Sequence, residues 1–140
     1  MSNLILETAK KILEEFKKKE HTNNSGTFTI EGPDVDFKAV LVQLTFSEEV
    51  RRLYITGRNG NDFAMWIADI TKGGFHELDI GPDVTHPVML LSNIAEANSG
   101  TFTVKTDDDF TFATGDFEFL ANGGSKYKCE IDIKPVKSSS

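Results

Sequence analysis

Apolar residues near the start of the chain recur with the period of an α-helix. The positions that share one face are Ile5, Ala9, Ile12, Leu13 and Phe16. Lysine and glutamate residues occupy the opposite face, which is typical of a helix that packs on a protein core. The spacing predicts an amphipathic helix over residues 3–19, with Ser2 or Asn3 as its cap. The turn-rich residues 21–26 end it.

From residue 27 onward, the apolar positions alternate with the period of a β-strand. Short alternating segments are separated by turn-forming residues, which is typical of antiparallel sandwiches and barrels. We therefore predict a single domain over residues 1–140 of the α+β class, mainly β. The N-terminal amphipathic helix packs on an antiparallel β-sandwich or barrel of about eight or nine strands. The β core spans residues 27–134, and residues 135–140 form a tail that frays.

Some predicted strands are apolar on both faces. They are residues 37–46, 53–58 and 62–70. Because a strand that is apolar on both faces is covered on both faces, we expect layers on each side of them. Asn59-Gly60 is a strong hairpin signal, and as the turn it places Leu53 opposite Trp66. The apolar run of residues 88–95 is too short to assign to a strand or a helical turn.

The second half of the chain contains two further hairpins. Residues 101–105 and 110–113 predict one over residues 106–109, whose aspartates fit a solvated loop better than a cation site. The apolar positions then change from even to odd numbers at Gly115, where we expect a β-bulge or a tight corner. The second hairpin crosses residues 122–125. Its final strand alternates without a fault, so Cys129 is expected to be a small core residue rather than a nucleophile.

Several short runs of the chain form a further pattern. It consists of Leu53–Gly57, Gly74–Leu78, Ser99–Val104 and Gly115–Ala121, followed by the alternating residues Ile131 and Ile133. Together they resemble small uncharacterised bacterial β domains, many of them lipoproteins, over about residues 36–133. This chain differs from them because it has no lipoprotein signal and carries the N-terminal helix. The resemblance implies a binding or structural module built on a β-sheet and supplies no catalytic residues.

Composition and charge limit the classes of function. Hydrophobic residues make up 39% of the chain and charged residues 26%, which is too apolar for a disordered protein. Residues 1–20 hold five lysines and four glutamates (+1), which leaves ten basic and eighteen acidic side chains (−8) for residues 21–140. So acidic a domain repels phosphate backbones, and we expect no direct binding of nucleic acid. Arg51, Arg52 and Arg58 could form a local basic spot.

The sequence also bears on the cellular compartment. A single cysteine excludes an intrachain disulfide and a cysteine-rich metal site. Residues 1–20 lack the apolar run of a signal peptide, and no run reaches the roughly 18 apolar residues of a membrane span. We therefore expect a cytoplasmic protein without membrane insertion. The pattern indicates no oligomeric state.

No residue pattern predicts a metal site, a cofactor or a catalytic residue. A zinc site of three histidines would need every histidine in the chain. In a strand, His76 points away from Glu77 and Asp79, so these three residues cannot share a metal. Asp83 and His86 lie in a predicted loop and fit an ordinary turn.

Tyr54, Phe63 and Trp66 on the predicted hairpin are candidate ligand-binding residues, because a barrel of about eight strands can hold one small molecule. The other interpretation is that they pack in the core beneath the helix. We hypothesise a non-catalytic binding or interaction domain whose partner is a protein or a small apolar ligand. Two alternatives stay open: an acidic inhibitor of the immunity or anti-defence type that opposes a basic target, and a small hydrolase or isomerase in an acid-lined cup.

Overall fold

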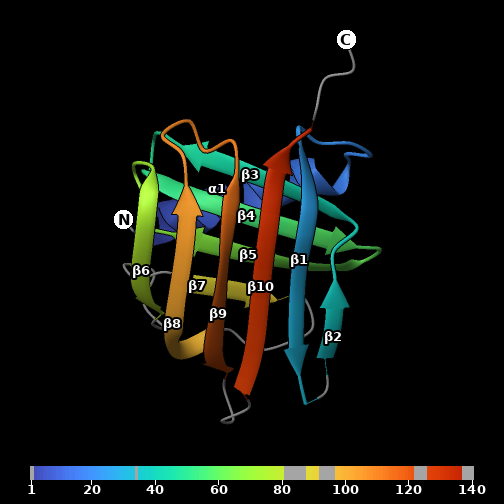
Figure 1. The fold of residues 1–140 in the computed structure, drawn as a ribbon. Helices are drawn as coiled ribbons and strands as arrows, with labels where there is room; N and C mark the ends of the chain where they lie inside the picture. Colours follow the sequence, from blue (N-terminus) through green and yellow to red (C-terminus); the bar gives the residue numbers. More distant parts are fainter. Residues whose placement is uncertain (1, 34, 81–87, 92–96, 122–125, 137–140) are drawn as a thin grey trace.

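Two antiparallel sheets and one helix form three layers in the computed structural model of the chain, which describes residues 2–33, 35–80, 88–91, 97–121 and 126–136 (Figure 1). The elements are α1 (Ser2–Lys17), β1 (Asn24–Gly32), β2 (Val35–Lys38), β3 (Leu41–Ser47), β4 (Arg52–Asn59), β5 (Asp62–Ala68), β6 (Gly74–Ile80), β7 (Val88–Leu91), β8 (Ala97–Thr106), β9 (Ala113–Ala121) and β10 (Lys126–Pro135). One sheet has the strand order β2-β1-β10-β9-β8-β6, and the other has the order β3-β4-β5-β7. Within these described ranges neither sheet closes into a barrel, and the predicted fold class is confirmed.

The main core lies between the two sheets, whose strands cross one another in Figure 1. Alternate side chains of β1, β8, β9 and β10 meet alternate side chains of β4 and β5 there. Trp66 is at the centre, and its ring lies 3.8 Å from the ring of Phe102 and 3.7 Å from that of Phe117, measured between centroids. Aromatic rings in such contact bury large apolar areas, which makes this layer the main source of hydrophobic stabilisation.

The helix covers the other face of the four-stranded sheet. Ile5, Ala9 and Ile12 of α1 pack on Tyr54 of β4 and on Met65 and Ile67 of β5. As a result, residues 53–57 and 64–68 are buried without interruption, as expected for strands that are covered on both faces. The predicted apolar face of the helix is confirmed. The helix spans residues 2–17 rather than 3–19, so the two predicted caps, Ser2 and Asn3, both lie inside it.

The single strand predicted over residues 37–46 is wrong. The backbone N–H of Ala39 donates to Phe28 of β1 at 2.9 Å, whereas the N–H of the next residue, Val40, donates to Arg58 of β4 at 2.8 Å. The chain therefore leaves one sheet and enters the other at this peptide, and Val40 is 74% exposed at the corner. Residues 37–46 are apolar at both odd and even positions because the side chains that face the core change from odd numbers in β2, such as Phe37, to even numbers in β3, such as Val42.

The β4–β5 hairpin has the predicted faces but not the predicted register. Leu53 lies opposite Ala68 rather than Trp66, because the turn residues are Gly60 and Asn61. Gly60 has a φ of 63°, and a glycine in the first central position is the pattern of a type II′ turn. When the turn moves by one residue, each residue of β4 pairs with a residue of β5 two positions further along. Because side chains alternate between faces every residue, a shift of two leaves each side chain on its predicted face.

The region around Gly115 also differs from the prediction. Strand β9 begins at Ala113, so Phe110 and Phe112 belong to the loop that follows Thr106. Asp107 holds this loop by accepting hydrogen bonds from the backbone N–H groups of Thr111 at 2.7 Å and Phe112 at 3.3 Å. Since Phe112 lies outside β9, the buried apolar positions within this strand are odd-numbered throughout, and no change from even to odd occurs at Gly115. Gly115 sits in regular pairing, where a Cβ would lie 2.0 Å from the carbonyl oxygen of Thr103.

The remaining boundaries shift by a few residues. Strand β1 begins at Asn24, within the predicted connection, and β10 continues through Pro135, where the tail was predicted to begin. The N–H of Val136 still donates to Asn23 at 2.9 Å. Residues 88–91 form a strand, while residues 92–95 and 137–140 lie outside the described part of the chain.

Arg58 joins the end of the helix to the sheet. Its guanidinium donates to the carbonyl oxygens of Phe16 at 3.3 Å, Lys17 at 2.5 Å and Lys19 at 2.8 Å, and it lies 5.5 Å from the ring centroid of Phe16. The carbonyls of Phe16 and Lys17 belong to the last turn of the helix, where its partial negative charge lies, and that of Phe16 also accepts from the backbone N–H of Lys19 at 3.1 Å. One planar cation therefore caps the helix and fixes it to β4.

The variant Arg58→Ala should lower the free energy of unfolding by about 2 kcal/mol, because three carbonyl groups lose a charged donor. Arg58→Lys should recover less than half of this loss, since an ammonium cannot serve three carbonyls from a fixed plane. Urea denaturation measures both changes. Lys38→Ala, which removes an exposed cation, is the control; a loss as large as that of Arg58→Ala would show that only charge matters.

Tyr54 provides a second anchor beneath the helix. Its hydroxyl donates to the carbonyl oxygen of Ile5 at 2.9 Å, and the residue is fully buried. Burial raises the pKa of Tyr54 from 10.0 to about 12, although the charge of Arg52 and a hydrogen bond with Thr8 act in the opposite direction. The phenol is therefore held neutral against the core.

A raised pKa in the folded state makes stability depend on alkaline pH. The contribution of Tyr54 is complete below its unfolded pKa of 10.0 and is lost as the pH rises to about 12. The loss should reach at most about 2.7 kcal/mol. Denaturant titrations across this range measure it in the wild type and in Tyr54→Phe, whose profile should be flatter. Equal slopes in the two proteins would contradict the assignment to Tyr54.

Candidate binding groove at the end of the helix

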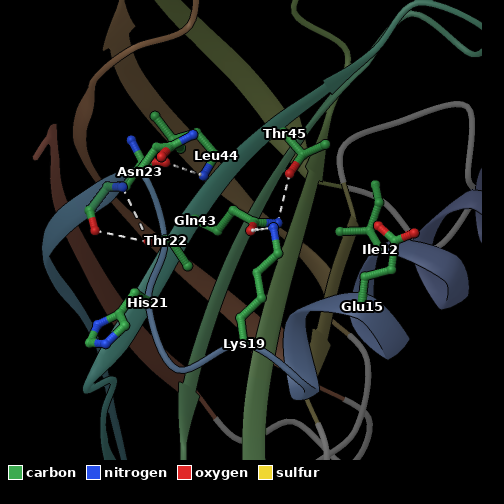
Figure 2. A pocket seen from close by; sticks show the side chains of 10 residues that line it. Ile12, Glu15, Lys19, His21, Thr22, Asn23, Gln43, Leu44 and Thr45 are labelled. Carbon is green, nitrogen blue, oxygen red and sulfur yellow. Dashed lines mark hydrogen bonds between the residues drawn. The ribbon is translucent and has the colours of Figure 1, made fainter.

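An open groove of about 320 Å³ lies between the end of α1, the segment that follows it and strand β3 (Figure 2). Its lining residues are Ile12, Glu15, Lys19, His21, Thr22, Asn23, Asn24, Gln43, Leu44 and Thr45, which we call the helix-end groove. Figure 2 shows Ile12 and Glu15 on the helix side and Gln43 and Thr45 on the strand side, with Lys19 reaching between them. Most of these side chains are polar.

The position of β3 at the edge of its sheet explains how the groove forms. An edge strand presents backbone groups that have no partner in the sheet. The hydroxyl of Thr22 donates to the carbonyl oxygen of Val42 at 2.6 Å, and the Oδ1 atom of Asn24 accepts from the N–H of Leu44 at 3.1 Å. Two side chains thus take the place of a neighbouring strand and hold the connection against β3.

A chain of hydrogen bonds crosses the floor of the groove. The ammonium of Lys19 donates to Oε1 of Gln43 at 2.8 Å, and Nε2 of Gln43 donates to Oγ1 of Thr45 at 2.9 Å. Gln43 is only 8% exposed, so its amide depends on these partners. The groove therefore has a polar floor that is held in one orientation.

Charge at this end of the helix differs from that of the rest of the protein. Lys17, Lys18 and Lys19 are exposed, and Arg58 lies against the last helical carbonyls. Glu15 is the acidic residue in the lining of the groove. Cations favour the C-terminal end of a helix, so the sequence that ends α1 also makes this region basic.

A second hollow, of about 490 Å³, lies beside the C-terminal half of β3 and shares Leu44 with the helix-end groove. It is lined by Leu44, Phe46, Glu48, Arg51, Thr71, Asp108, Asp109 and Phe110, which we call the acidic hollow. The rings of Phe46 and Phe110 stack 4.5 Å apart at its base. Its three carboxylates belong to exposed residues. General acid catalysis near neutral pH requires a carboxyl group shielded from water, so this arrangement does not favour a catalytic role.

The structure separates the three predicted ligand-binding residues. Trp66 packs between the sheets, and Tyr54 packs beneath α1 on the opposite face of the same sheet. Phe63 is half-buried on the helix side, with Nζ of Lys17 5.3 Å from its ring centroid. The three side chains line no common space, and their role in ligand binding stays a prediction, while Tyr54 and Trp66 occupy the two hydrophobic clusters.

Other candidate residues can also be placed. Glu77 and Asp79 are exposed on β6, while His76 faces the other way and its Nε2 lies 2.9 Å from the carbonyl oxygen of Lys72. Asp83 and His86 lie outside the described residues. Within the described residues, no group of three or more histidine, cysteine, aspartate or glutamate residues is arranged to hold a metal. Cys129 is buried as predicted, and burial, with a smaller contribution from Glu130, raises the pKa of its thiol.

Comparison of this chain with known protein families, with curated proteins and with solved structures found no match. The resemblance to small bacterial β domains therefore stays a prediction. Among the described residues, no helix has the length and apolar character to cross a membrane.

The residues of the helix-end groove did not stand out in the sequence. Gln43 was the one available signal, because a glutamine between Val42 and Leu44 interrupts an apolar strand. Its partner Lys19 lies 24 residues away and resembles any lysine on a solvated helix. The groove therefore depends on how the helix docks, which local patterns do not contain.

Thr56 lies directly beside Gln43 in the β3–β4 register. It is fully buried, and its hydroxyl has no hydrogen-bond partner among the described residues. Thr56→Val keeps the shape of the side chain and removes the unsatisfied group, so it should raise the free energy of unfolding by about 1 kcal/mol. Thermal denaturation should show a rise in Tm of about 2–4 °C. Thr27→Val, at an exposed position on β1, should change Tm little; a destabilised Thr56→Val protein would show that the hydroxyl is satisfied.

Proposed function

We propose that this protein is a non-catalytic binding domain that holds a segment of a partner polypeptide in the helix-end groove. The hydrogen-bonded Gln43 on the groove floor supports the proposal best, because a buried amide held from both sides forms a preorganised recognition element. Two walls of the groove belong to a helix and a strand, which fix recognition groups more firmly than loops do. The connection that carries Lys19 is held against β3 by the hydrogen bonds of Thr22 and Asn24.

The lining of the groove favours a polypeptide over a small apolar ligand. Lys19, Gln43 and Thr45 offer donors on one side, and Glu15 offers an acceptor on the other. An apolar molecule would take these groups out of water without giving them partners, which is costly. A peptide backbone carries donors and acceptors along its length, so it satisfies both walls.

The two alternatives receive less support. A catalytic cup would use the acidic hollow, whose carboxylates are solvated. An acidic antagonist of a basic target would need a surface of one sign. The outer face of the six-stranded sheet is mixed instead, since Lys126 lies 3.1 Å from Glu118 and Lys134 lies 3.9 Å from Asp132.

Selection from a display library of random short peptides tests the proposal. The wild-type protein should enrich peptides that bind it, and Gln43→Leu, which removes the amide but keeps an apolar side chain, should lose about ten-fold or more in affinity for them, as buried polar partners are left unpaired. Glu130→Gln, on the far face of the six-stranded sheet, is the matched control.

Two results would contradict the proposed function. One is a selection that yields no peptide above background. The other is a set of selected peptides that bind Gln43→Leu and the wild type equally, which would place their site elsewhere. Circular dichroism of Gln43→Leu shows whether its sheets are intact, so that lost binding is not mistaken for lost folding.

A further inference from the structure

The partner segment in the helix-end groove has a definite chemistry. We infer that it carries a carboxylate, and that Lys19 and Thr45 bind this group. The inference rests on the proposed function, and it names the class of partner: an acidic stretch of polypeptide. Its basis is the direction of the hydrogen bonds on the groove floor, together with the distribution of charge.

The floor of the groove presents more donors than acceptors, because Gln43 Oε1 and Thr45 Oγ1 already accept one hydrogen bond each. The ammonium of Lys19 uses one N–H on Gln43, which leaves two. The reverse orientation of the Gln43 amide would set its NH₂ group against the ammonium, so the direction of the chain is determined. Thr45 accepts from Gln43, so its own O–H can donate to another group. A ligand group that accepts hydrogen bonds from both Lys19 and Thr45 therefore matches this floor best.

The surrounding charge favours an anionic acceptor over a neutral one. Residues 1–20 carry a formal charge of +1, whereas residues 21–140 carry −8, so this region repels an anion less than the rest of the surface. Arg58 neutralises the helical carbonyls that would otherwise oppose a negative group here. Glu15 stands on the other wall, where it can accept N–H groups from the backbone of the same segment.

The same distribution limits the size and charge of the partner. A long polyanion such as nucleic acid would extend from the groove over the acidic remainder of the protein and be repelled. One carboxylate, or a few on a short segment, meets only the basic end of α1. The groove thus fits an acidic polypeptide rather than a phosphate backbone.

Two capped tripeptides, acetyl-Gly-Glu-Gly-amide and acetyl-Gly-Gln-Gly-amide, test the inference because they differ only in charge. Each is titrated into the ¹⁵N-labelled protein at low salt, while the side-chain amide of Gln43 and the backbone amide of Thr45 are followed by NMR. The glutamate peptide should bind about three-fold more tightly, as one partly exposed ion pair provides. High salt should remove this preference.

Variants of Lys19 separate charge from structure. Lys19→Met keeps the apolar stem and should bind the two peptides equally, whereas Lys19→Arg should retain the preference. Lys38→Met, a distant exposed lysine, should behave as the wild type does. Unchanged resonances of β4 and β5 in Lys19→Met would show that the fold is intact.

The outcomes distinguish the two proposals. Equal shifts at Gln43 and Thr45 with both peptides would overturn the carboxylate and leave the proposed function standing. A preference for glutamate that persists in Lys19→Met would overturn the assignment to Lys19. Shifts outside the groove, or no shift with either peptide, would overturn the inference, and the peptide selection then decides whether the proposed function falls as well.

Discussion

The structure depends on burying one sheet on both of its faces. Strands β4 and β5 are apolar in both phases, so they need a layer on each side. The six-stranded sheet provides one layer and α1 provides the other. Without the helix, Tyr54, Met65 and Ile67 would be exposed to water, and a helix of 16 residues gains most of its stability from that packing. The three layers are therefore interdependent.

The position of the helix has consequences for the surface. Its last turn ends beside β3, and Arg58 holds it there through three carbonyl groups. The connection that follows must then run along the free edge of β3, which Thr22 and Asn24 cover with their side chains. The helix-end groove is the space left between these elements. It therefore results from the way α1 covers the four-stranded sheet.

Two buried polar side chains on the helix side of the four-stranded sheet differ in their hydrogen bonding. Gln43 is nearly buried but makes two hydrogen bonds, whereas the hydroxyl of its neighbour Thr56 makes none among the described residues. A buried hydroxyl without a partner costs stability, while a buried amide with partners rigidifies its surroundings. Gln43 is therefore suited to recognition, whereas the hydroxyl of Thr56 only costs stability. Composition and charge do not reveal this difference, because it depends on which groups lie within hydrogen-bond distance.

The sequence by itself determined the helix with its apolar face, the change to β structure after the turn-rich residues 21–26, and the double burial within residues 53–58 and 62–70. These features follow from the period of apolar residues, which is local. Tertiary structure alone decided that the chain changes sheet at Ala39 and Val40 and that Lys19 meets Gln43. Each of these depends on contacts between segments far apart in the chain. The alternation of apolar residues shows which face of a strand a side chain occupies, but not which other strand or helix packs against that face.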